Sequence, residues 1–210
     1  MKKSLRIMGK RIDLDASSVL WDKPFSAATF AEHWDVRGGE WAVEGDALVG
    51  KGRQPGVFVF SQQRFPGNVL MEFYGQTVLP STHDLDFMWN TEWDEKTQTR
   101  KTGYVVGIQG WWHGKLGVER PDSTFGGMVP CPWFRPGVEY FIQAGSIEGH
   151  CFVFVNGSLM FEAIDPTPVD SQRYNRVGFE VFQSMIRVRA LTLRQIAWTT
   201  EQSAYPEESF

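Results

Sequence analysis

Hydrophobic and polar residues alternate with a period of two along most of the chain, which is the pattern of half-buried β-strands. Val69, Met71 and Phe73 fall on one face of such a stretch, and Leu70 and Glu72 fall on the other. Segments with the 3.6-residue period of a helix are few. The best helix candidate is short, residues 26–34, with a serine in the capping position at its start.

The same pattern predicts about a dozen strands joined by short turns. They cover residues 41–44, 47–50, 57–60, 68–77, 83–90, 103–109, 115–119, 138–144, 151–155, 158–161, 176–182 and 186–196. Gly45-Asp46 and Asn156-Gly157 separate two of the pairs, and Asn-Gly suits the two positive-φ positions of a type I′ turn. Strands joined without intervening helices are typical of an all-β sandwich of two antiparallel sheets.

Length and charge narrow the classes of protein. With 210 residues, we expect one all-β domain over 1–210 with irregular termini at about 1–20 and 199–210. A net charge of −4 and the lack of a basic cluster beyond the first eleven residues argue against nucleic acid as a partner. No apolar run approaches the ~20 residues of a membrane helix, so we expect no membrane partner.

The start of the chain and the cysteines bear on location. The first eleven residues carry positive charges but lack the apolar middle of a signal peptide, which favours a cytoplasmic protein. Cys131 and Cys151 then read as two free thiols, although the sequence leaves their pairing open. The four histidines have no metal-site spacing, and we expect no cofactor and no metal site.

The order of motifs resembles concanavalin A-like lectin and glucanase domains. That resemblance rests on a tryptophan-led first strand, a Gly-Asp turn, an Asn-Gly hairpin and an alternating last strand. The segments that carry it are 34–36, 45–48, 71–73, 155–157, 177–183 and 186–193. Within the superfamily, the chain is most similar to cytoplasmic jelly rolls of pectin- and oligosaccharide-utilisation clusters, and next to keto-disaccharide hydrolase-like domains. The resemblance spans roughly residues 30–196 and implies a concanavalin A-like jelly roll that handles carbohydrate.

Residues 83–90 carry the strongest candidate for chemistry. Strand alternation turns Asp84 and Asp86 to the face opposite the core, roughly 7 Å apart at Cβ. Two such carboxyl groups can divide into an acid and a base, as glycosidases require. Endoglucanases of the resembling family carry a third acid on this strand, whereas Met88 or Trp89 stands here, so the family's general acid is missing. The alternative is that the aspartates bind Ca²⁺, cap a loop or face water.

Residues 90–96 read as a polar loop after that strand. Its oxygen-rich side chains could ligate a structural Ca²⁺, but no fixed ligand spacing supports such a site, and a solvated loop is the simpler interpretation.

Aromatic residues make up 14% of the chain, with nine tryptophans. Trp111 and Trp112 are adjacent, so both cannot point inward from one strand, and an exposed indole suits the apolar face of a sugar ring. An aromatic plug at one end of the sandwich is the alternative. His113 could serve as an acid or a base, and Arg120 could clamp a sugar carboxylate or form a surface ion pair.

These features give two sets of candidate site residues. The catalytic candidates are Asp84, Asp86, His113 and Glu119. The substrate-binding candidates are Trp89, Asn90, Trp93, Tyr104, Gln109, Trp111, Trp112, Arg120, Glu180 and Gln183. We expect an oligosaccharide or glycoside ligand and, in the first instance, an enzyme of glycoside hydrolase or lyase type. The alternatives are a non-catalytic carbohydrate-binding or accessory protein and a structural jelly roll that pairs with another protein. The sequence does not indicate the oligomeric state.

Overall fold

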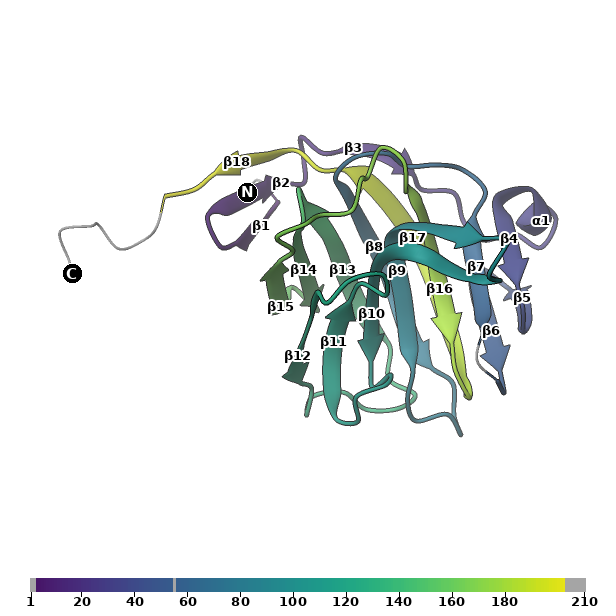
Figure 1. The fold of residues 1–210 in the computed structure, drawn as a ribbon. Coiled ribbons are helices and arrows are strands. Elements are labelled where there is room, and N and C mark those ends of the chain that lie inside the picture. The colour runs from purple at the N-terminus through teal and green to yellow at the C-terminus, as the bar shows by residue number, and fades with distance from the viewer. Residues whose placement is uncertain (1–2, 55, 203–210) are drawn as a thin grey trace.

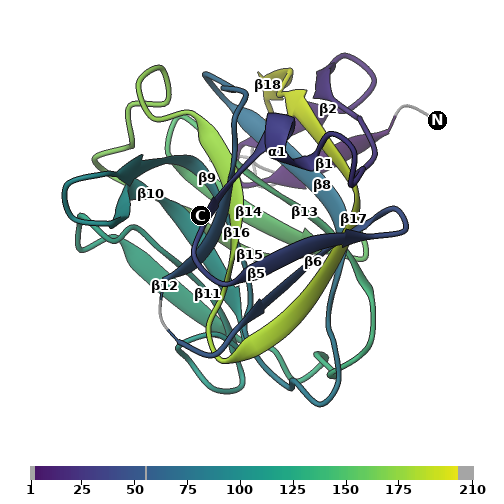
Figure 2. The same cartoon turned by 90° about the vertical axis from the view of Figure 1, so that its right-hand side faces the viewer.

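A computed structural model describes residues 3–54 and 56–202 as an antiparallel β-sandwich with a small third sheet at one end (Figure 1). The predicted fold class is confirmed: the described residues hold one short helix, and every strand pair among them is antiparallel. Figure 2 views the sandwich from the end where α1 (Phe30–His33) lies. None of the described residues form a helix that could cross a membrane.

One layer of the sandwich is a seven-stranded sheet that carries the candidate site. Its strands, in spatial order, are β12 (Gly126–Pro130), β11 (Lys115–Glu119), β10 (Thr99–Ile108), β9 (Leu85–Asp94), β16 (Arg176–Val181), β7 (Val57–Ser61) and β4 (Trp34–Arg37).

The other layer is an eight-stranded sheet. Its strands, in spatial order, are β15 (Ser158–Ile164), β14 (His150–Val155), β13 (Tyr140–Ile147), β8 (Val69–Thr77), β17 (Ser184–Gln195), β6 (Ala47–Gly52) and β5 (Glu40–Glu44), with β3 (Ser18–Trp21) paired to β17.

The main core lies between these two sheets and follows the predicted alternation. Met71 and Phe73 of β8 and Leu85, Phe87 and Trp89 of β9 all point into it. The edge-to-face contact of Phe73 with Phe87, at 5.1 Å between ring centroids, joins the two layers. The Asn156-Gly157 turn has the two expected positive φ angles, 50° and 81°.

The first residues of the chain differ from the irregular terminus that we expected. β1 (Ser4–Ile7) and β2 (Lys10–Asp13) form a hairpin, and β18 (Trp198–Thr200) joins it to complete the third sheet. Leu5, Ile7 and Ile12 pack on Leu70 and Phe152, on the outer face of the eight-stranded sheet. Isolated four-residue strands carry too little pattern to stand out, and this hairpin is held by tertiary burial. Residues 203–210 of the expected irregular C-terminus lie outside the described residues.

Two local predictions are corrected. The helix is a single turn over Phe30–His33 without a side-chain cap, and Ser26 accepts the backbone N–H of Thr29 through its carbonyl oxygen. The expected polar loop at 90–96 is strand: β9 continues to Asp94, and β10 begins at Thr99. We call residues 91–102 the β9–β10 arm. In Figure 1 it leaves the sheet and swings across β16 toward β4.

Candidate functional site

The outer face of the seven-stranded sheet holds rows of side chains that run across the strands. One row, read strand by strand from β12 to β4, consists of Met128, Gly117, Gly107, Asp86, Glu180, Phe58 and Arg37. Asp86 and Glu180 are thus directly opposite each other on β9 and β16. Directly opposite residues of antiparallel strands have Cβ atoms roughly 4.5–5.5 Å apart, so the two carboxyl groups are neighbours.

Asp84 supports Asp86 from the residue that precedes β9. It has a positive φ of 70°, which turns its carboxylate back to accept the backbone N–H of Phe182. The Asp86 carboxyl donates a hydrogen bond to the Asp84 carboxylate. Asp86 is 2% exposed, and its Oδ1 has no hydrogen-bond partner among the described residues. A buried carboxyl oxygen without a partner is costly.

Glu180 is held by a cation from the arm. Arg100 on β10 donates from Nη1 to Glu180 Oε2 at 2.5 Å, and both side chains are 14% exposed. Glu119 on β11 lies close enough for its charge to act on both Arg100 and Glu180. We call Asp84, Asp86, Glu119, Glu180 and Arg100 the acidic cluster, in which one cation faces four carboxyl groups.

Burial and crowding raise the pKa of every carboxyl group in this cluster. Burial raises the pKa of Asp84 to about 6, although the Phe182 N–H, Asp86 and Arg100 act in the opposite direction. Burial, then the charges of Asp84 and Glu180, hold the pKa of Asp86 well above its usual range. Burial raises the pKa of Glu180 to about 7 against the pull of Arg100, and burial also raises the pKa of Glu119. Asp86 therefore holds its proton more tightly than an ordinary carboxyl group does, and it lies beside Glu180, whose pKa is about 7.

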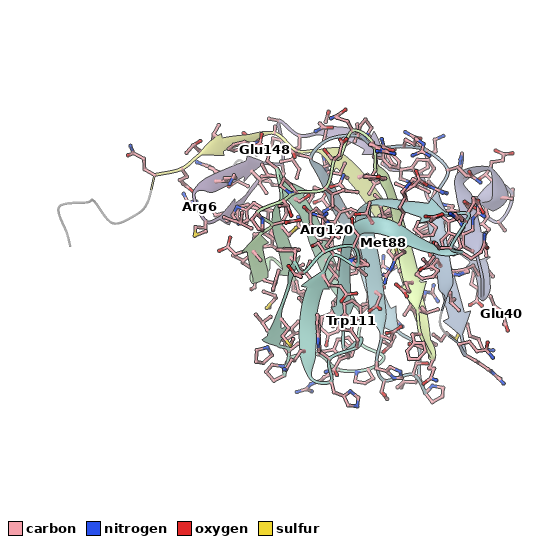
Figure 3. All side chains as sticks on the ribbon, viewed as in Figure 1. Arg6, Glu40, Met88, Trp111, Arg120 and Glu148 are labelled. Carbon is pink, nitrogen blue, oxygen red and sulfur yellow. The ribbon has the colours of Figure 1, made fainter. Side chains whose placement is uncertain are left out.

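Two tryptophans lie on the same face next to the cluster. A Cβ atom at Gly107 would be 2.7 Å from Cζ3 of Trp111, and one at Gly117 would be 1.8 Å from Cζ3 of Trp112. Only glycine at these two positions leaves room for the two indole rings to pack on the outer face of the sheet. The same Gly107 Cβ would be 3.1 Å from Asp86 Oδ1, so Trp111 borders the buried carboxyl. Trp111 is 39% exposed and stands near the free end of the sheet in Figure 3.

The fold has counterparts among solved structures, although the sequence matches no protein-family model and no curated protein. A Bacillus subtilis protein of unknown function with a galectin-like fold has a TM-score of 0.67 at 11% identity, over 86% of this chain and 97% of its own. The endo-β-1,3-glucanase from Pyrococcus furiosus has a TM-score of 0.62 at 10% identity, over 94% and 99%. The carbohydrate-binding module CBM66 from Bacillus subtilis has a TM-score of 0.54 at 13% identity, over 80% and 96%.

The chain has the concanavalin A-like fold. Solved structures with a similar fold include a galectin-like protein, a carbohydrate-binding module and a glucanase. Identities near 10% show the fold alone, so the chemistry of this concanavalin A-like chain must come from its own residues.

Three of the predicted binding residues lie inside the concanavalin A-like sandwich and do not face the cluster. Trp89 is fully buried and donates from Nε1 to Ser146 Oγ at 3.0 Å. Tyr104 is buried and donates its hydroxyl proton to Asp165 at 3.1 Å. Asn90 is buried at the base of the arm and donates to the Gly67 carbonyl. Strand alternation already assigned Trp89 to the core. The high tryptophan content of the chain was what suggested that it binds a ligand.

Other predicted residues have structural partners instead of a free surface. Arg120 is held by Asp122 at 2.8 Å, by Asp165 at 3.0 Å and by the Thr167 carbonyl, so its guanidinium is not a free clamp. Gln109 accepts the Gly114 N–H at 2.8 Å and braces the turn that carries the two tryptophans. Trp93 packs in the arm, as described below.

Two predicted residues are exposed away from the carboxyl pair. His113 is exposed in the turn between β10 and β11, and no recorded contact joins it to the acidic cluster. Gln183 is exposed in the turn after β16 and lines a hollow of about 390 Å³ with Lys51 and Arg53. The structure therefore brings together Asp84, Asp86, Glu119, Glu180 and Trp111, with Trp112 beside Trp111.

Arg100 is the residue of the cluster that the sequence did not indicate. It lies in the arm between the polar loop predicted at 90–96 and the strand predicted from 103, and nothing in its local pattern marks it. The sequence did indicate its partner, Glu180, because a polar residue between Phe179 and Val181 was expected on the outer face. No group of three or more His, Cys, Asp or Glu within 3–54 and 56–202 is arranged to hold a metal ion.

Proposed function

We propose that this protein binds a small saccharide at the acidic cluster and cleaves a glycosidic bond there. One observation carries the proposal: Asp86 and Glu180 face each other across two strands, with raised pKa values, beside a partly exposed tryptophan. Paired carboxyl groups with different environments supply the acid and the base of glycoside cleavage. An exposed indole supplies the apolar platform for a sugar ring.

Each carboxyl group has a distinct role in this proposal. Asp86, whose pKa is held well above its usual range by burial, acts as the general acid toward the leaving oxygen. Glu180 is favoured in its ionised form by the ion pair with Arg100 and acts as the carboxylate partner of the oxocarbenium-like transition state. Asp84 is a positioning residue, because its hydrogen bond and charge hold the proton on Asp86.

The carboxyl groups of Asp86 and Glu180 come from directly opposite positions, and we propose that they act in a retaining reaction, which requires two neighbouring carboxyl groups. Directly opposite residues on antiparallel strands are separated by roughly 4.5–5.5 Å at Cβ. Retaining glycosidases keep their carboxyl groups roughly 5–5.5 Å apart, and inverting enzymes need roughly 6.5–9.5 Å. Glu180, from the neighbouring strand, would then replace the acid that is missing at Met88 on β9.

The experiment is an intrinsic-fluorescence titration with ladders of β-1,3-glucan, β-1,4-glucan, β-fructan and galacturonide oligosaccharides, followed by chromatography of the mixtures. We expect a saturable shift with one ladder and the appearance of shorter saccharides. An unsaturated product that absorbs ultraviolet light would indicate elimination, the lyase form of the proposal. If no ladder shifts the fluorescence, the proposal that this face binds a saccharide would be wrong.

The role of Glu180 has its own chemical test. In Glu180→Ala, azide can enter the space of the lost carboxylate and attack the sugar, and a glycosyl azide then accumulates. Asp86→Ala should instead keep activity only on substrates whose leaving group needs no proton. The glycosyl azide from Glu180→Ala should have the inverted anomeric configuration, because azide attacks the substrate directly, whereas any glycosyl azide from Asp86→Ala should keep the configuration, because azide attacks the covalent intermediate. The opposite pair of configurations would reverse the two roles.

A non-catalytic binding protein is the second candidate. The observation that favours it is the near-complete burial of Asp86, since a general acid must reach the glycosidic oxygen. One of the structural neighbours is itself named a carbohydrate-binding module. A fluorescence shift without products over long incubation would support this candidate.

A further inference from the structure

The β9–β10 arm covers one half of the sheet face on which the acidic cluster lies. Phe58, Phe60, Met88, Trp93 and Val105 form a separate apolar cluster on this outer face, and all five are buried. Trp93, from the arm, lies 5.6 Å from the ring of Phe58 and 5.9 Å from that of Phe60. Phe58 is the neighbour of Glu180 in the cross-strand row, so the cover begins directly beside the proposed site.

The sharp bend of the arm is built into the backbone. Asn90 has a positive φ of 47° and Gly103 one of 130°, and the β9–β10 ladder shifts its register between Thr102 and Tyr104. A Cβ at Gly103 would lie 2.5 Å from the Cβ of Thr91, so only glycine fits this position. The bend therefore directs the arm over β16 and β7 as a fixed feature.

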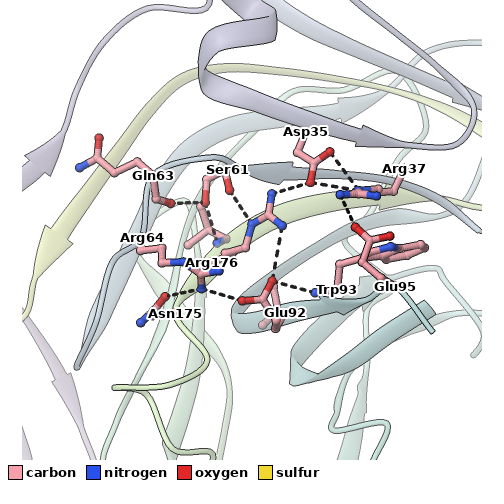
Figure 4. A network of polar contacts seen from close by, with 12 residues as sticks. Asp35, Arg37, Ser61, Gln63, Arg64, Glu92, Trp93, Glu95, Asn175 and Arg176 are labelled. Atoms are coloured by element: carbon pink, nitrogen blue, oxygen red, sulfur yellow. Dashed lines mark hydrogen bonds and ion pairs between the residues drawn. The ribbon is translucent and has the colours of Figure 1, made fainter. Parts of the chain in front are cut away.

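Charged side chains bind the first strand of the arm to the sheet beneath it (Figure 4). Arg176 of β16 is buried and binds Asp35 at 2.9 Å and Glu92 of the arm at 3.5 Å. Its Nε donates to the Ser61 carbonyl at 2.6 Å. Near the tip, Arg37 binds Glu95 at 2.7 Å.

Two further ion pairs join the arm to its surroundings. Arg64 binds Glu92 at 2.6 Å, and Arg100 binds Glu180 at 2.5 Å while lying over the ring of Phe58. Because the arm is bound to three strands beneath it, it forms a fixed cover on the sheet and not a movable lid.

The other half of the same face is open. Trp111 and Met128 are 39% and 41% exposed, and Glu119 of the acidic cluster is partly exposed. On the side of Glu180 that faces β7, Arg100 and Trp93 lie over Phe58 and cover the sheet face.

We propose that the arm closes one end of the saccharide site, so that the protein takes short saccharides or the ends of chains and excludes the interior of long polymers. This inference rests on the proposed saccharide site. It assigns Trp93 and Arg100 as the residues that set where the bound chain must stop.

The test compares an oligosaccharide ladder with the polymer of the same sugar, by titrating the fluorescence of the full chain with each. A tetrasaccharide and the polymer should give coincident curves when concentration is expressed in chain ends, and early products should be released from a terminus. Curves that coincide only when concentration is expressed in sugar residues, or early products from mid-chain, would overturn the inference and leave the saccharide site standing. Absence of any shift would remove both.

Removal of the cover gives a second test. Trp93→Ala uncovers Phe58 and should let the polymer bind along its interior, with a several-fold gain in affinity per chain end. Trp198→Ala in the third sheet is the matched control and should change nothing. Because Trp93→Ala opens a cavity, Arg37→Ala with Glu95→Ala loosens the tip without one and should shift binding the same way. A folded Trp93→Ala protein that still binds only chain ends would contradict the role of the arm.

Discussion

The two halves of one sheet face differ in nearly every physical respect. On the β7 and β16 side, Phe58 and Phe60 are buried beneath the β9–β10 arm and its arginines. On the β11 and β12 side, Met128 and the two tryptophans of the adjoining turn meet solvent to different degrees. The acidic cluster lies at the border: Glu180 is bound by Arg100 of the arm, and Asp86 lies next to Gly107 and Trp111 on the other side.

This contrast explains how the cluster obtains its properties. Burial is the first cause of the raised pKa of Asp84, Asp86 and Glu180, and access through the open half would let a ligand use these groups. A fully open face would hydrate the carboxyl groups and return their pKa values toward normal, whereas a fully covered face would admit no substrate. Placing the carboxyl groups at the border serves both needs.

Asp86→Asn tests the acidic cluster at the border between the two halves, and we expect it to have the largest effect on turnover. The amide is isosteric and can still donate to Asp84, so the fold should persist, but it cannot transfer a proton. Turnover should fall by about 10²- to 10⁴-fold, the usual contribution of a general acid. Rates of product formation measure this loss.

A matched control is Asp46→Asn in the exposed turn between β5 and β6, which should leave turnover unchanged. Undiminished turnover in Asp86→Asn would exclude Asp86 from the mechanism.

The covered half is tested by Phe60→Ala. Phe60 is fully buried between Trp93 and the guanidinium of Arg176, and its loss leaves a cavity that the pinned arm cannot fill. The free energy of unfolding should fall by about 3–5 kcal/mol. Met128→Ala, on the open half, should change it by no more than about 0.5 kcal/mol. Urea denaturation of both variants measures the difference, and equal losses would mean that the two halves are equally packed.

Most of the fold could be predicted from the sequence because its information is local. Strand alternation assigned Phe73 and Phe87 to the core, and Asn156-Gly157 set a hairpin by its φ requirement alone. The hairpin of β1 and β2 escaped prediction because its partners, β18 and Phe152, lie far away in the chain.

The candidate site was predictable only in part, for the same physical reason. Asp84 and Asp86 lie within one strand pattern, and their pairing was visible as a spacing. The pairing of Asp86 with Glu180 depends on the register of β9 with β16, residues that are far apart in sequence. Arg100 reaches the cluster only because the arm bends at Gly103, which no period-two pattern expresses.

The raised pKa values of the acidic cluster also predict how the stability of the fold depends on pH. A carboxyl group whose pKa is raised by folding binds its proton more tightly in the native state, so its stabilising effect is complete below the unfolded pKa and disappears as pH rises through the folded pKa. For Asp84 and Glu180 this window runs from about 4 to about 6 and 7. Each unit of raised pKa corresponds to roughly 1.4 kcal/mol, shared among coupled groups.

Thermal unfolding at a series of pH values checks this expectation. The melting temperature should decline from weakly acidic to neutral pH, and Asp86→Asn should flatten the decline because one buried acid no longer ionises. A melting temperature that rises over the same interval would contradict the raised pKa values.

The smallest effect is expected for a tryptophan on the open half. Because each half has a tryptophan, the same Trp→Ala substitution can be compared in both. Trp111→Ala removes a platform that is partly exposed and should weaken saccharide binding by about 0.5–1.5 kcal/mol, or about 2- to 10-fold in Kd, with little change in stability. Trp93→Ala removes the same side chain from beneath the arm and should cost about 3–5 kcal/mol of stability. Fluorescence titration and urea denaturation of both proteins separate the two effects. If Trp111→Ala destabilised the fold as much as Trp93→Ala does, the tryptophans of the open half would be core, and the border would no longer mark a binding site.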